Sequence, residues 1–322
     1  MTRIVSQHPA YPGARAERGF SMVELLVALG LSMVIVVATT YVYLGTRETQ
    51  RALFEKAYAS ETAHYALDVI GRDIENAGFY PSSAVVGVVQ TYSNPVPVTA
   101  SPPAAYNAKV FGCQANKYDP AASTPACAAH SSGVDADTLM VNSYTNDVSG
   151  LDIGNRADCL RQDSANDSVN ATRLAATPMQ PLFVSSRYTL VATAAQVEGQ
   201  AISTFSLACN GNGKAVTDSV YEPIVAGVDQ LRFYYLVRAG DSTSNSQFVR
   251  ANAVTLANNW ANVVAVRVCL MTRSMQSARL QGSTSYTIAD CDGTSRSFTD
   301  GLERRVSSQT FALKNHTQIL NF

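Results

Sequence analysis

The sequence predicts an α+β protein, with one long N-terminal helix packed on a mainly antiparallel β-sheet head that carries long loops and disulfides. An apolar run over 20–46 continues into an amphipathic helical pattern that ends near Ala77. Short strand-like segments follow, separated by turn-rich stretches, which is the α+β order. All six cysteines lie beyond the helix, in the part expected to form the head.

The chain begins with a polar leader, residues 1–19, that contains Arg3, Arg15 and Arg18. An ordinary secretory signal has a small-residue cut site after its apolar core, and no such site with a plausible spacing follows this core. The apolar run is long enough to span a bilayer, for which about 20 residues suffice. Because basic residues stay on the cytoplasmic side, the C-terminal bulk is expected to cross the membrane.

Glu24 is the only charged side chain between Phe20 and Thr46. A carboxylate deep in a membrane helix costs about 2.5–3.5 kcal/mol on insertion scales and usually marks function. A plain signal anchor with a tolerated glutamate is the alternative.

The segment from Gly19 to Val27 (GFSMVELLV) resembles the class III leader of type IV pilins and pseudopilins. The resemblance implies that a prepilin peptidase cuts after Gly19 and methylates the new N-terminus at Phe20. It also implies that Glu24 is the assembly glutamate. The free amine of Phe20 would be mostly cationic at neutral pH and could pair with Glu24 of a neighbouring chain, since a buried carboxylate needs a partner.

The helix is expected to have two halves, a membrane-spanning half over 20–46 and an amphipathic half over 47–78. Gly78 is the expected stop, and residues 79–322 form the head. Apolar or small residues recur three and four positions apart, as on one face of a helix. These residues are Leu53, Ala57, Ser60, Ala63, Leu67, Ile70, Ile74 and Ala77. The end of the helix, 72–79, resembles that of minor pilins.

An even number of cysteines in an exported domain indicates disulfides. Sequence alone leaves the pairing open; nearest neighbours would give Cys113–Cys127, Cys159–Cys209 and Cys269–Cys291. Zinc is the alternative, but no CxxC or paired Cys/His spacing supports a metal site.

Residues 81–136 are rich in proline and are expected to be loop-like. Period-two patterns and β-formers predict strands beyond them. The predicted strands are 137–144, 182–193, 201–208, 230–237, 263–271 and 309–313. Trp260 and the aromatic run 233–235 are expected in the core or on an edge strand.

Two further segments resemble the PilW group of minor pilins. One is 221–235, with the phrase Pro-Ile-Val-Ala-Gly-Val, and the other is 302–315 near the C-terminus. The last pair in that group is more often Arg-Asn, so Lys314 is a small departure.

No catalytic motif is present: the sequence contains no Gly-x-Ser-x-Gly, HExxH or phosphate-binding glycine loop. Residues 290–293 could suggest calcium, but the EF-hand spacing fails and a turn is favoured. Removal of residues 1–19 leaves 21 basic and 24 acidic residues, a net charge of −3. That charge disfavours nucleic-acid binding by this chain alone, although Arg304, Arg305 and Lys314 could form a local basic patch.

The resemblance implies a minor pilin that primes type IV pilus assembly and sits in the tip complex, with a structural role, no cofactor and no metal. Its expected partners are the other minor pilins and the major pilin, contacted through the N-terminal helix, together with prepilin peptidase and a tip adhesin. Before assembly it would cross a bacterial inner membrane once, with its head in the periplasm. The alternatives are a minor pseudopilin of a type II secretion system and an adhesive or DNA-uptake tip subunit.

Overall fold

The computed structural model describes residue 19 and residues 21–79, 84–85, 88–89, 109–119, 126–131, 133–145, 157–166, 170–171, 182–197, 199–213, 220–238, 247–276 and 285–315. The chain divides into two compact units, one ending at Arg51 and the other beginning at Ala52. Each unit is described by itself below.

Helix α1 (Met22–Asn76) contains 55 residues, which corresponds to about 80 Å at 1.5 Å per residue. No proline interrupts it. Gly78 ends it with a φ of 73°, a backbone conformation that glycine adopts at little cost. The Gly78 N–H donates to the Asn142 carbonyl at 2.8 Å, so the stop also ties the helix end to the head. The predicted long helix and its stop are confirmed.

In the second unit, one face of α1 is buried against the head. The prediction was wrong at the start of this face, because Leu53 and Ala57 are exposed while Glu55 and Ala59 are buried. The Ala59 carbonyl accepts a 2.8 Å hydrogen bond from the Thr272 hydroxyl, so this turn of the helix faces the head. From Ala59 onward the buried apolar residues are Ala59, Ala63, Ala66, Leu67, Ile70, Ile74 and Ala77.

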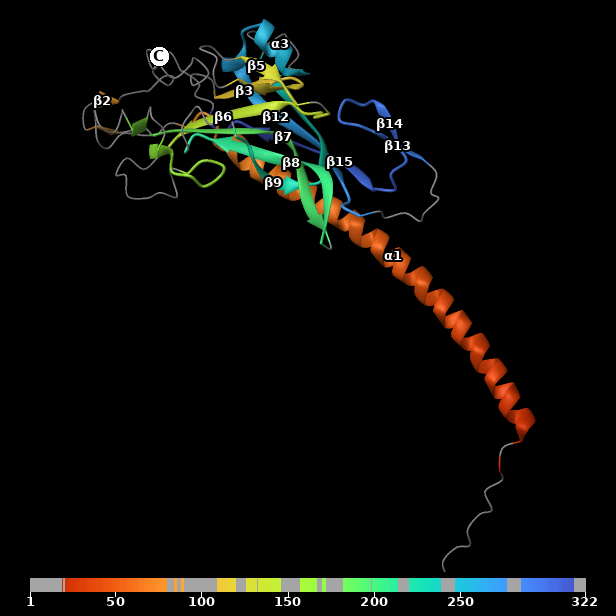
Figure 1. Cartoon of the computed structure of the whole chain (residues 1–322). Helices are drawn as coiled ribbons and strands as arrows, with labels where there is room; N and C mark the ends of the chain where they lie inside the picture. Colours follow the sequence, from red (N-terminus) through yellow and green to blue (C-terminus); the bar gives the residue numbers. More distant parts are fainter. Residues whose placement is uncertain are drawn as a thin grey trace, which may run out of the picture. The chain divides into compact units, whose positions relative to one another are not determined.

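Two antiparallel sheets form the head (Figure 1). The five-stranded sheet has the order β3-β6-β7-β8-β9, with bounds Val110–Cys113, Thr138–Tyr144, Phe183–Val197, Gln200–Gly211 and Glu222–Ala226. The four-stranded sheet has the order β11-β10-β12-β15, with bounds Phe248–Val249, Val228–Val237, Val263–Arg273 and Arg304–Ala312.

The chain passes from one sheet to the other at Gly227, inside the Pro-Ile-Val-Ala-Gly-Val phrase. Its φ of 84° lets the backbone turn between β9 and β10. Its N–H donates to the Phe205 carbonyl at 2.9 Å, and its carbonyl accepts from Arg273 at 2.8 Å, so this residue bonds to both sheets.

Smaller elements decorate the sheets. Three hairpin-like pairs are β1–β2 (Ala84–Val85, Val88–Val89), β4–β5 (Asn116–Tyr118, Cys127–Ala129) and β13–β14 (Tyr286–Ala289, Ser295–Phe298). Short helices are η3 (Ser164–Asn166), α3 (Ala251–Leu256) and η4 (Trp260–Asn262).

Each of the six predicted strands overlaps an observed strand. The loop-like assignment of 81–136 was wrong in part, because β3, β4 and β5 lie there. The last strand begins at Arg304 rather than 309. Helix α3 was not predicted, since its six residues are too few to show a helical period.

A single large core joins the end of α1 to both sheets. Ile70 and Ile74 of α1, Leu190 of β7, and Leu231 and Phe233 of β10 belong to it. The aromatic run is therefore mainly core, as expected. Trp260 is half-buried and packs against the Phe111 and Tyr235 rings, with ring centroids 5.1 and 4.9 Å apart.

Candidate functional site

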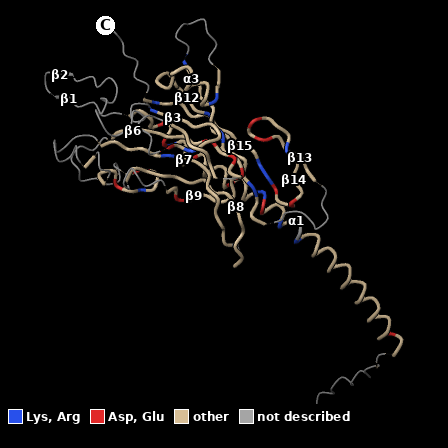
Figure 2. Tube along the Cα trace, turned by 45° about the horizontal axis from the view of Figure 1, so that its top comes forward, with Lys and Arg blue, Asp and Glu red and all other residues tan. Residues whose placement is uncertain are grey.

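The N-terminal part of α1 is a long apolar surface. Every side chain that the structure describes from Ser21 to Arg47 is exposed, and by length and composition this stretch could cross a membrane. Figure 2 shows the run without charge except for an acidic position near its start. An apolar surface of this length needs lipid or other apolar helices around it.

Glu24 lies in the first turn of α1, where a carboxylate interacts favourably with the helix dipole. Its neighbours Val23 and Leu25 are 67% and 56% exposed. Nothing lies within 4 Å of where a side chain on Gly19 would begin. Phe20 lies outside the described residues.

The six cysteines form three disulfides: Cys113–Cys127, Cys159–Cys209 and Cys269–Cys291. This is the nearest-neighbour pairing. The first bridge ties β3 to β5, the second ties the 157–166 segment to β8, and the third ties β12 to the turn between β13 and β14. Each bridge therefore holds a peripheral segment on a sheet strand.

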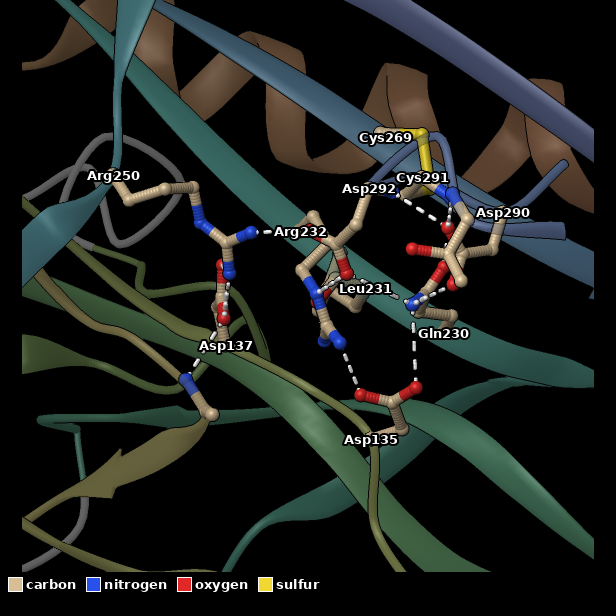
Figure 3. A network of polar contacts seen from close by, with 12 residues as sticks. Asp135, Asp137, Gln230, Leu231, Arg232, Arg250, Cys269, Asp290, Cys291 and Asp292 are labelled. Carbon is tan, nitrogen blue, oxygen red and sulfur yellow. Dashed lines mark hydrogen bonds and ion pairs between the residues drawn. A yellow bond between two sulfur atoms is a disulfide. The ribbon is translucent and has the colours of Figure 1, made fainter.

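A network of charged side chains surrounds the third disulfide (Figure 3). Arg232 on β10 donates to Asp135 and, through Nε at 2.8 Å, to Asp292. Arg250 bonds Asp292 at 2.5 Å and Asp137 at 2.8 Å. Arg296 extends the network from β14 to Asp135 at 2.7 Å.

The turn between β13 and β14 is part of this network. The Asp290 carboxylate accepts backbone N–H bonds from Asp292 at 2.9 Å and Thr294 at 2.8 Å, and a 2.7 Å bond from Arg296. Gln230 donates to it at 3.3 Å and accepts the Cys291 N–H at 2.9 Å. Residues 290–293 thus form a turn whose carboxylates are already satisfied, so the turn interpretation holds over calcium.

Burial and ion pairing have opposite effects on the pKa of the carboxyl groups in this network. Burial raises the pKa of Asp135, but the guanidinium groups of Arg232 and Arg296 outweigh burial and bring that pKa below its usual value. Burial dominates at Asp137, whose pKa is raised despite Arg250. Among the described residues, no group of three His, Cys, Asp or Glu side chains is placed to hold a metal. The network of ion pairs and hydrogen bonds therefore clamps the β13–β14 hairpin to the four-stranded sheet.

Sequence reasoning missed most of this clamp. Asp135 and Asp137, like Gln230 and Arg232, lie two residues apart and so can share one face of an extended segment. That spacing was the available signal, but the two pairs lie far apart in the chain.

The expected basic patch does not form as three free cations. Arg304 is buried and bonds Asp229 at 2.7 Å and Asp300 at 2.6 Å. Lys314 pairs with Glu75 at 2.6 Å. Two of the three side chains of the possible patch are thus paired with carboxylates, which weakens the DNA-uptake alternative.

Two family models match the chain. Residues 188–315 match the model described as type IV pilus-assembly protein W, and residues 14–40 match the prokaryotic N-terminal methylation motif. The second match includes Gly19, Phe20 and Glu24. The first covers β8, the Gly227 junction and the whole four-stranded sheet.

Among solved structures, a type IV-like pilin from Thermus thermophilus resembles the chain at 10% identity and a TM-score of 0.35. The likeness covers 80% of this chain and 97% of that one, but it is too loose to carry an argument. No curated protein sequence matches the chain.

Proposed function

We propose that this chain, a PilW-type minor pilin by its two matched segments, primes assembly of a type IV pilus and stays in the complex at its tip. Its role is structural rather than enzymatic. The observation that carries the proposal is the exposed apolar surface over 21–47 with Glu24 as its one acidic side chain.

Prepilin peptidase would cut between Gly19 and Phe20 and methylate Phe20. Cleavage there removes the basic leader but leaves the whole apolar run on the mature chain. The run then anchors the protein once in the inner membrane, with the head in the periplasm. The order of the leader and the apolar run supports this topology.

Glu24 would guide the chain into the filament. Within one chain it lies about 6 Å along the helix axis from Phe20, at 1.5 Å per residue. A neighbouring subunit that is shifted along the axis can bring its own N-terminal amine alongside the carboxylate. Pairing of this kind offsets the cost of a buried charge and selects one axial position for the incoming subunit.

The size of the head favours the tip. Within 79–322, the described residues form two large sheets, three small hairpin-like pairs and three disulfides. A head of this size would crowd a helical shaft built from smaller repeating subunits, whereas a tip has free space around it. The proposed partners are the other minor pilins, the major pilin and a tip adhesin.

Intact mass and N-terminal sequencing of the chain from membranes and from sheared pili test the processing. We expect methylated Phe20 as the first residue in both fractions, and an uncut chain when Gly19 is replaced by valine. A chain that begins at Met1 and occurs only in membranes would refute the model.

Glu24→Ala tests assembly. We expect normal insertion and cleavage but loss from the pilus fraction and fewer pili. Ser32→Ala is the matched control, because Ser32 is a polar residue in the same run whose hydroxyl bonds the Leu29 carbonyl of its own helix at 2.9 Å. Normal pilus counts with Glu24→Ala would contradict the role of Glu24.

A further inference from the structure

Strand β15 lies at the edge of the four-stranded sheet in the part of the chain that the structure describes. It contains nine residues, Arg304–Ala312, and pairs with β12 alone in the part of the chain that is described. Every position from Arg304 to Ala312 is in register with β12, without a bulge. An edge of this length can template pairing with another strand.

The hydrogen bonds at the two ends of β15 reveal which of its backbone groups point toward β12 and which point away from it. The Ser274 N–H donates to the Glu303 carbonyl at 2.8 Å, and the Leu313 N–H donates to the Val264 carbonyl at 2.9 Å. In an antiparallel pair, bonding residues alternate with residues whose N–H and C=O groups point away. Odd-numbered positions therefore bond β12, and the outward-pointing residues are Arg304, Val306, Ser308, Thr310 and Ala312.

The other sheet edges are protected in ways that β15 is not. Strand β11 has two residues and β3 has four, while β9 contains Pro223 and a register shift. Short length, proline and bulges are the usual means of blunting an edge. β15 has none of these, and its positions 308–310 are exposed on both faces.

The direction of β15 argues against a second copy as its partner. Along the strand, Glu303 pairs with Lys56, Phe311 packs beside Gly71, and Lys314 pairs with Glu75, so β15 runs in the same direction as α1. Antiparallel pairing of two copies would make their α1 helices run in opposite directions. Helices that are anchored in one membrane by the same end run in the same direction, so the two arrangements conflict. Parallel pairing about a two-fold axis would place each outward-pointing residue opposite the same residue of the other copy. In a parallel ladder, an outward-pointing residue bonds the residues before and after the one opposite it, so this register would leave the hydrogen bonds unmade.

The charge at the edge indicates the chemistry of the partner. Arg305 is exposed and forms no ion pair among the described residues. The rest of the exposed edge, over 306–310, is uncharged. A strand that carries an acidic side chain beside Arg305 would complement it.

We propose that the open edge of β15 receives an extended strand from a different pilus protein, with a carboxylate beside Arg305. The inference rests on the proposed function, because it takes the partner from the same pilus.

Photo-crosslinking in cells that express the complete pilus system tests the proposal. The full chain carries a photoreactive benzoylphenylalanine at Gln309, an exposed edge position. We expect one adduct, whose crosslinked peptide lies in an extended segment of another pilus subunit. Adducts with a second copy only, or with a protein that is not a pilus component, would overturn the proposal.

Ser308→Pro removes an outward N–H without breaking a bond to β12, as proline on an edge strand can. We expect the adduct yield to fall about tenfold, the effect of losing about 1.4 kcal/mol. Ser308→Ala keeps the N–H and should keep the yield. An unchanged yield with Ser308→Pro would refute strand addition.

Arg305→Glu provides a second variant should Ser308→Pro fail to fold. We expect it to lower the yield severalfold, and an unchanged yield would refute the predicted carboxylate. The unsubstituted chain is assayed in sheared pili in parallel. Its absence there would count against the proposed function, whereas its presence without an adduct at β15 would count against this inference alone.

Discussion

Gly71 lies where α1 crosses Phe311 of β15, and it offers a direct test of the helix–sheet packing. A Cβ atom at Gly71 would lie 2.2 Å from Phe311 Cε1 and 2.5 Å from Cζ. Both residues are buried, so the ring has little room to move. Gly71→Ala therefore sets the higher helix propensity of alanine against its steric conflict with the Phe311 ring.

The two effects have opposite signs. Alanine should stabilise an exposed helix by up to about 1 kcal/mol relative to glycine. Overpacking of a well-packed core costs about 1–3 kcal/mol. We expect packing to win, with a net loss of about 1–2 kcal/mol. For a domain of this size, that loss lowers the midpoint of thermal unfolding by roughly 2–6 °C.

Thermal unfolding of the full chain in detergent, followed by circular dichroism under oxidising conditions, measures the effect. His64→Ala is the control, since His64 is an exposed position on the same helix. Phe311→Leu should make room for the new methyl group, so the double variant should lose less stability than the two single losses combined. If Gly71→Ala alone stabilised the head, the helix–sheet contact would be wrong.

Three other changes test the head in the same assay. Burial raises the pKa of Asp73, and the hydrogen bond from the Tyr188 hydroxyl offsets part of that rise. Asp73→Asn should keep or raise stability at pH 7. Asp73→Leu removes the hydrogen-bond acceptor of the Tyr188 hydroxyl and should cost about 1–3 kcal/mol. The hydrogen bond from Arg304 lowers the pKa of Asp300 below 3.8, so its stabilisation is complete above that value and is lost as pH falls through the folded pKa; Asp300→Asn should flatten this acid loss. Cys291→Ser should cost about 2–3 kcal/mol, and no loss would mean that the ion pairs alone hold the turn.

Local patterns predicted the parts of the fold that keep a regular apolar pattern over many residues or carry a distinctive residue. The apolar run and Gly78 bounded α1 to within two residues, and alternation over 263–271 identified β12. Glu24 was conspicuous as a charge in an apolar run. Those signals need no knowledge of distant parts of the chain.

Contacts between distant segments could not be predicted. Asp135 and Arg232 are separated by 97 positions, and nothing local to either indicates the pairing. The start of the buried helix face likewise lies against a distant residue, Thr272, which bonds the Ala59 carbonyl across 213 positions. Apolar periodicity alone therefore placed Leu53 inside and Glu55 outside.

In the topology proposed above, the order of the three disulfides along the chain has a consequence for export. The bridges follow one another without crossing, with separations of 14, 50 and 22 residues. When the head emerges N-terminal end first, each cysteine pair is complete before the next pair begins to appear. Oxidation in order of emergence then gives the native connectivity directly, and no thiol–disulfide rearrangement is required to correct it.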